Sequence, residues 1–161
     1  LKTMYYLIDT NILLRLCDKN NPKHLVIRQA IRHLRTQENK LYICSQNCAE
    51  FWNVATRPAN KNGLGLTIKK TAKALRLIER IFILLPDIGD TYQHWKQLII
   101  TYQVKGVQVH DARLVAIMKA CNIPYILTFN TDDFQRYLPE NITSISPDDL
   151  IKQSESKEMT E

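Results

Sequence analysis

Short apolar, β-rich segments alternate with helical segments along most of the chain, and this alternation constrains the fold more than any other feature. Five apolar runs are expected to form strands, at 4–8, 41–45, 82–86, 124–128 and 141–146. Six segments between them are expected to form helices, over about 10–17, 23–37, 45–57, 67–81, 90–104 and 111–121. This order predicts a mainly parallel sheet with helices on both faces, a three-layer α/β/α sandwich.

Helix boundaries are marked by residues suited to caps and breaks. Thr10 or Asn11, Ser45 and Thr67 are expected to cap the helices that follow them, and Pro58 should stop the third helix. The intervening segment "PANKNGLGL" is expected to be a loop because of its proline, asparagine and glycine content.

Length and composition place the chain in a broad class. Its 161 residues predict one domain over 1–150, followed by a polar, disordered tail at 151–161. No apolar run approaches membrane-spanning length and no signal peptide is visible, so a cytoplasmic protein is expected. The four cysteines match no zinc spacing and are expected to be reduced. The net charge of +6 suits a polyanionic partner.

Acidic residues lie beside apolar residues in four places, each at the end of a predicted element. They are Asp9 after the first strand, Glu50 in "CAEFW", Asp111 in "VHDARLVAIM", and Asp132 with Asp133 in "LTFNTDDF". The carboxyl ends of parallel strands share one edge of a sheet, where ligands bind in folds of this class. We therefore expect these carboxylates to converge.

Each acid also has a simpler interpretation. Asp9 could simply be a helix cap, Asp111 could complement a helix dipole, and Glu50 could pair with Arg57 or a lysine. Several carboxylates gathered at one edge would, however, repel one another and raise one another's pKa. Mg²⁺ or Mn²⁺ prefers oxygen ligands and would remove this penalty. Such a metal in a basic protein indicates phosphate chemistry, in which an activated water attacks a phosphodiester.

Four motifs, in this order, resemble the acidic motifs of PIN-domain nucleases: "LIDTNILL", "AEFW", "HDARLVA" and "ILTFNTDDF". Over 4–150 the chain most resembles VapC-type toxins, the ribonuclease halves of type II toxin–antitoxin pairs. The resemblance implies a PIN-like sandwich and a Mg²⁺- or Mn²⁺-dependent endoribonuclease that leaves 5′-phosphate and 3′-hydroxyl ends. It also implies a cognate antitoxin, an RNA substrate and a homodimer.

The resemblance assigns catalytic and metal-binding roles to particular acids. Asp9, Glu50 and Asp111 match the first three acidic positions directly. At the fourth, Asn130 stands where many members carry aspartate, so the role passes to Asp133, with Asn130 as a further metal ligand through its amide oxygen. Asp132 remains an alternative, and the number of metals stays open.

Supporting roles fall to neighbouring polar residues. Thr10, Asn11 and Thr128 are expected to hydrogen-bond the metal ligands. RNA contacts are expected from the flexible loop after the third helix and from the first residue of "HDARLVA". The candidates are Arg57, Lys61 and His110.

Two alternatives to the toxin remain open, and a third is disfavoured by the first motif. The disfavoured one is a haloacid-dehalogenase-type phosphatase, which needs a second acid two residues after the first, where Asn11 stands instead. An RNA-processing PIN nuclease that is not a toxin would share the same acids. A catalytically decayed module that binds RNA or a partner remains open because Asn130 replaces an acid.

Overall fold

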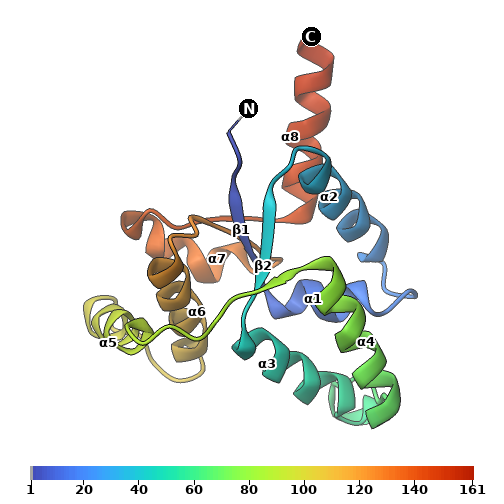
Figure 1. Cartoon of the computed structure of the whole chain (residues 1–161), viewed down its shortest axis with the longest axis horizontal. Coiled ribbons are helices and arrows are strands. Elements are labelled where there is room, and N and C mark those ends of the chain that lie inside the picture. Colours follow the sequence, from blue (N-terminus) through green and yellow to red (C-terminus); the bar gives the residue numbers. More distant parts are fainter. Residues whose placement is uncertain (1) are drawn as a thin grey trace.

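The computed structural model describes residues 2–161, and its central feature within them is a five-stranded parallel sheet (Figure 1). The strand order is β3-β2-β1-β4-β5, and every neighbouring pair is parallel. The strands are β1 (Tyr5–Ile8), β2 (Lys40–Ile43), β3 (Ile83–Leu84), β4 (Tyr125–Leu127) and β5 (Thr143–Ile145). The predicted parallel sheet is thus confirmed.

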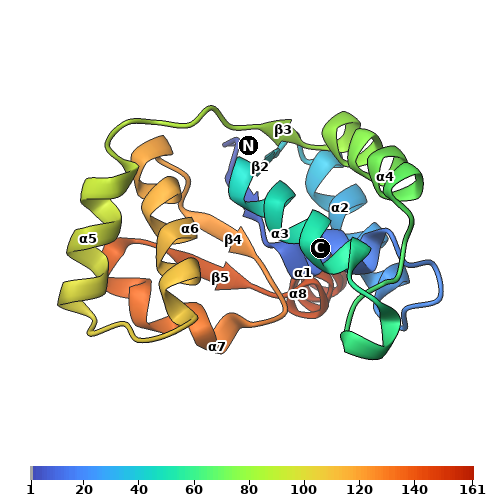
Figure 2. The same ribbon diagram turned by 90° about the horizontal axis from the view of Figure 1, so that it is seen from below.

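Helices cover both faces of this sheet and form two separate cores (Figures 1 and 2). One core is built with α1 (Thr10–Leu16), α2 (His24–Thr36), α3 (Ser45–Thr56), α4 (Ile68–Ile81) and α8 (Pro147–Thr160). The other is built with α5 (Thr91–Thr101), α6 (Gln108–Cys121), α7 (Thr131–Phe134) and the 3₁₀ segment Gln135–Glu140. The predicted three-layer α/β/α sandwich is confirmed.

The central strand shows why both faces must be covered. Side chains alternate along β1, so Tyr6 and Ile8 enter one core while Leu7 enters the other. Leu7 and Ile8 are completely buried. A strand buried on both faces needs a continuous apolar sequence, which "YYLI" supplies.

The predicted strands and helices are present with differences at their ends, whereas α7 and α8 were not predicted. The α2 helix buries the apolar face that its spacing predicts. The third strand is shorter than expected and contains only Ile83 and Leu84, at the exposed edge of the sheet. The sixth predicted helix, expected over 111–121, begins three residues earlier, because α6 starts at Gln108.

The start of α3 corrects one predicted cap. Ser45 is the first helical residue, and Cys44 is the N-cap. Asn47 Oδ1 accepts a hydrogen bond from the Cys44 N–H at 3.0 Å and thereby anchors the turn. The predicted cap of α4 is confirmed, since Thr67 Oγ1 accepts from the Lys70 N–H at 3.1 Å.

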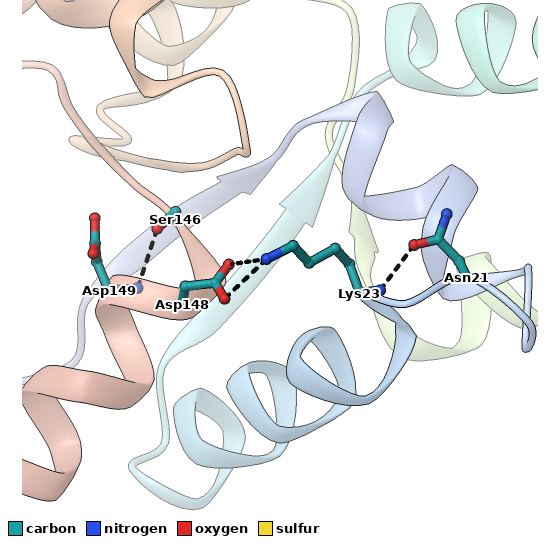
Figure 3. Close-up of polar contacts among 5 residues, drawn as sticks. All are labelled: Asn21, Lys23, Ser146, Asp148 and Asp149. Atoms are coloured by element: carbon teal, nitrogen blue, oxygen red, sulfur yellow. Dashed lines mark hydrogen bonds and ion pairs between the residues drawn. The ribbon is translucent and has the colours of Figure 1, made fainter.

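The segment 151–161, expected to be a disordered tail, instead continues α8 through Thr160. Ser146 Oγ caps this helix by accepting from the Asp149 N–H at 3.1 Å, and Pro147 occupies its first turn. The Lys23 ammonium pairs with Asp148 at 3.2 Å and ties the start of α8 to the segment before α2 (Figure 3). The polar composition that suggested disorder belongs to an exposed, capped helix that projects beyond the sheet (Figure 1).

Two further properties concern the described residues as a whole. The four cysteines are free, and Cys44 is the one that is buried. Within 2–161, no helix combines the length and the apolar character needed to cross a bilayer.

Candidate active site

Asp9 leaves the carboxyl end of β1 and is held in a nearly buried position, 6% exposed. It caps α1, which corrects the expectation of Thr10 or Asn11, because its Oδ1 accepts from the Thr10 N–H at 2.8 Å. Its Oδ2 accepts from Thr128 Oγ1 at 2.8 Å, across the boundary between β1 and β4. The carboxylate is therefore fixed in orientation by two neighbouring strand ends.

Asn11 and Thr128 form the support that the sequence predicted around this carboxylate. Asn11 Nδ2 lies 3.3 Å from both Asp9 Oδ2 and Thr128 Oγ1. Its Oδ1 accepts from the Phe129 N–H at 3.3 Å, and Thr128 Oγ1 accepts from the Asn130 N–H at 3.0 Å. These bonds join α1 to the segment after β4.

Glu50 lies on α3 and is connected to Asp9 through Thr10. Thr10 Oγ1 donates to Glu50 Oε2 at 2.8 Å, while the Thr10 N–H donates to Asp9. Gln46 Nε2 donates to the other oxygen, Oε1, at 2.7 Å. No ion pair joins Glu50 to Arg57 or to a lysine among the ion pairs of residues 2–161, so the simpler interpretation of this acid does not hold.

Asp111 occupies the first turn of α6 and completes a group of mutually repelling charges. Burial raises its pKa to about 7, and the negative charges of Asp9, Asp133 and Glu50 add to this shift, against a small opposing effect of Arg136. These carboxylates come from different elements at the carboxyl edge of the sheet and are close enough to affect one another.

The pKa of Asp9 is also raised, to about 6. Burial is the largest cause, and the negative charges of Glu50 and Asp133 contribute in the same direction. The hydrogen bonds from Thr128 and Thr10 oppose the rise, because they stabilise the charged form. The charged form of Asp9 is thus costly in this site, despite good hydrogen bonding.

The fourth acidic position is supplied by the short helix α7. Asp133 is exposed in its first turn, and its N–H donates to the Asn130 carbonyl at 3.0 Å. Asp133, and not Asp132, contributes to the raised pKa of Asp9 and of Asp111. Asn130 is exposed at the N-cap of α7, and its side chain makes no cap hydrogen bond. This geometry favours Asp133 with Asn130 beside it.

The donor set fits a hard divalent cation in its chemistry. Carboxylate oxygens are the ligands that Mg²⁺ and Mn²⁺ prefer, and none of the four acids takes part in an ion pair among residues 2–161. In the same residues, no three His, Cys, Asp or Glu side chains converge closely enough to hold an ion as they stand. Among the four acids, Asp133 is exposed, Glu50 and Asp111 are half-buried, and Asp9 is buried.

Several polar residues around the acids were not predicted from the sequence. Gln46 lies four residues before Glu50 on α3, a helical spacing that could have identified it. Asn47 is fully buried and donates to Thr10 Oγ1 at 3.3 Å. Arg113 reaches Gln46 from α6, and Arg136 lowers the pKa of Asp111 from the segment after α7; no sequence signal marks these two.

The predicted RNA contacts lie in different surroundings. Arg57 ends α3, beyond Glu50, and its Nε is buried without a hydrogen-bond partner in the described part of the chain. Its carbonyl accepts from the Gly65 N–H at 2.9 Å, which fixes the loop. Lys61 is exposed in this loop, and His110 is exposed beside Asp111. Only His110 adjoins the acids.

Comparison with solved structures finds the same fold in VapBC and VapC proteins. Two structures align with a TM-score of 0.66 over 89% of this chain and 98% of theirs. They are VapBC2 from Rickettsia felis bound to a promoter DNA fragment, at 17% identity, and VapBC-1 from nontypeable Haemophilus influenzae, at 18% identity. VapC20 from Mycobacterium tuberculosis, a toxin that cleaves the Sarcin-Ricin loop, aligns at 0.57 with 15% identity over 80% of this chain and 92% of its own. No curated protein matches the sequence.

A family comparison covers most of the chain. The PIN domain matches residues 6–138, a span that includes every acid of the candidate site. The chain belongs to the PIN-domain family.

Proposed function

We propose that this protein is a Mg²⁺- or Mn²⁺-dependent endoribonuclease, and that it is the toxin of a toxin–antitoxin pair. The observation that carries the proposal is the group of four acids at one sheet edge. Burial and mutual repulsion raise the pKa of two of them, and none has a cationic partner among the ion pairs of residues 2–161. Such an arrangement costs stability unless a cation joins it.

The positions of the side chains support the catalytic roles that we propose. Asp9, Glu50, Asp111 and Asp133 would hold the cation, and the Asn130 amide oxygen would assist them. A divalent ion bound there supplies positive charge to the scissile phosphate and makes water a better nucleophile. Thr10 and Thr128 keep the first two carboxylates in place through hydrogen bonds of 2.8 Å. A carboxylate of the group accepts the proton of the attacking water.

The substrate and partners rest on charge and on similarity. The excess of 22 basic over 16 acidic residues suits an RNA backbone, and we assign contacts to Lys61, Arg57 and His110. The toxin role is supported by the likeness to VapC20, a Sarcin-Ricin loop cleaving toxin, and to a toxin–antitoxin complex from Klebsiella pneumoniae. We accordingly propose a cognate antitoxin, a homodimer and a cytoplasmic location.

A second candidate is a PIN module that binds RNA or a partner without cutting. Asn130 favours it, because an amide replaces the acid that many relatives carry. A PIN nuclease that processes RNA without being a toxin is a third. Cleavage of RNA by the purified protein would exclude the module that binds without cutting. Growth arrest on expression, relieved by the product of the neighbouring gene, would distinguish a toxin from a PIN nuclease that only processes RNA.

Cleavage of labelled RNA by the purified chain tests the proposal. We expect cutting with Mg²⁺ or Mn²⁺, no cutting with EDTA, and loss of activity in Asp9→Asn. Asp18→Asn is the matched control: this residue follows α1, and its carboxylate accepts a hydrogen bond from the Asn20 N–H. Cleavage at the normal rate by Asp9→Asn, or cleavage that persists in EDTA, would contradict the assignment.

A further inference from the structure

One side chain joins the two layers of helices at the edge that carries the acids. Gln46 belongs to α3, which packs in the first core, whereas α6 packs in the second. Gln46 Nε2 donates to Glu50 Oε1 at 2.7 Å and to the His110 carbonyl at 2.9 Å. Arg113 Nη1 donates to Gln46 Oε1 at 2.8 Å. Gln46 thus links Glu50 to the residues that flank Asp111.

The three partners agree on a single orientation of the Gln46 amide. The Glu50 carboxylate and the His110 carbonyl can only accept, so each must face the NH₂ group. The Arg113 guanidinium can only donate, so it must face the amide oxygen. Rotating the amide by half a turn would break all three bonds. The side chain is therefore held in one state by its surroundings.

Glu50 receives one hydrogen bond at each carboxylate oxygen, from different elements. Thr10 Oγ1 donates to Oε2 at 2.8 Å and is itself bonded by the buried Asn47. Gln46 holds Oε1 from the more exposed side. Each oxygen keeps a further lone pair, so a carboxylate oriented in this way can still bind a cation.

Resting on the proposed function, we propose that Gln46, held by Arg113, is a positioning residue that fixes the Glu50 carboxylate relative to the turn of α6 that carries Asp111. Without Gln46, the Glu50 side chain would lose its link to α6 and gain rotational freedom. Metal sites depend on such outer partners, whose loss weakens affinity by roughly 10–100-fold. Gln46 would act on the cation only through Glu50.

Arg113 offers a rival explanation, because an exposed guanidinium can also bind an RNA phosphate. The two roles differ in what they change. A residue that acts through Gln46 alters the affinity for the cation. A residue that binds RNA alters KM for RNA and leaves the affinity for the cation intact.

Manganese binding by the full chain, followed by electron paramagnetic resonance of free Mn²⁺ without RNA, tests the proposal. We expect Gln46→Ala to weaken Mn²⁺ binding about tenfold and Arg113→Ala to weaken it less. The double variant should be no worse than Gln46→Ala, because Arg113 acts through Gln46. Gln97→Ala, at an exposed position of α5, is the control that should not change. In RNA cleavage, kcat should fall at low Mn²⁺ and recover at high Mn²⁺, with KM for RNA unchanged.

Unchanged Mn²⁺ affinity in Gln46→Ala would overturn the proposal. Additive losses, with a raised KM for RNA in Arg113→Ala, would overturn the part assigned to Arg113.

Failure of the proposed function has a different signature. The Asp9→Asn variant would then bind Mn²⁺ with the same affinity as the unaltered chain. In that case, NMR of the Gln46 side-chain amide decides. Slow hydrogen exchange relative to Gln97, lost in Glu50→Ala, supports the link, and fast exchange insensitive to that change refutes it.

Discussion

Replacing Asp9 with asparagine should make the protein more stable at pH 8 without divalent ions, although it should abolish cleavage. The pKa of Asp9 rises from 3.8 to about 6 in the folded chain, chiefly through burial. A shift of this size corresponds to about 3 kcal/mol of unfavourable free energy for the charged form, at roughly 1.4 kcal/mol per pKa unit. Asparagine avoids this cost because it carries no charge.

Part of the gain is lost with the hydrogen bonds. Asparagine is a good N-cap and can keep the bond from the Thr10 N–H, but its NH₂ can accept neither from Asn11 Nδ2 nor from Thr128 Oγ1. Two lost bonds of this kind cost about 2 kcal/mol. The net stabilisation expected at pH 8 is therefore about 1 kcal/mol, which in a chain of this length raises Tm by roughly 2–4 °C.

The effect has a defined pH dependence. The folded state of the unaltered chain binds more protons than the unfolded state wherever the pH lies between the unfolded pKa of 3.8 and the folded pKa of about 6. Protonation of Asp9 therefore contributes stability that is fully present below pH 3.8 and is lost as the pH rises through 6. The advantage of Asp9→Asn should accordingly disappear between pH 6 and pH 4.

Urea unfolding in EDTA, followed by circular dichroism at pH 8, 6 and 4, measures this difference. Asp18→Asn serves as the acid-to-amide control and should show no gain that disappears over this pH range. If Asp9→Asn is less stable than the unaltered chain at pH 8, or if the difference is independent of pH, the raised pKa of Asp9 is wrong. Adding Mg²⁺ should stabilise the unaltered chain and leave the variant unchanged.

Two further substitutions test separate parts of the structure. Thr128→Val removes the 2.8 Å hydrogen bond to Asp9 that opposes the rise of its pKa, so the pKa of Asp9 should rise further and cleavage should require more Mg²⁺. Carbon NMR measures this pKa, and an unchanged value would contradict the assigned bond. Ser146→Ala removes the cap of α8 and should cost about 1 kcal/mol, with faster amide hydrogen exchange in α8 and normal RNA cleavage; unchanged exchange would show that the cap does not hold the helix.

The sequence predicts the sheet and most helices because their signals are local. The continuous apolar run of β1 and the spaced apolar face of α2 each depend on a few neighbouring residues. The cap at Asp9 is the simpler interpretation of that acid, beside Thr10 and Asn11, and the helix start alone does not choose among them. The cap at Cys44 was missed because cysteine is not a common N-cap residue and Ser45 beside it is. The whole of α8 was missed because polar composition alone does not distinguish an exposed capped helix from a disordered tail.

The candidate site was predictable in its acids but not in its connections. Parallel strands bring their carboxyl ends to one edge, so residues following β1, β2 and β4 could be placed together from the sequence. The bonds from Gln46 to His110 and from Arg113 to Gln46 join residues 64 and 67 positions apart. Such contacts depend on how α3 and α6 meet in space, and no local pattern in either helix encodes that meeting.

The central claim is that the four acids hold a divalent cation in one site. Anomalous diffraction from crystals soaked in Mn²⁺ tests it most directly. The account predicts a manganese peak within ligand distance of Asp9, Glu50 and Asp111, with Asp133 turned toward it. A peak elsewhere, or none at this edge with the carboxylates pointing apart at high Mn²⁺, would contradict it.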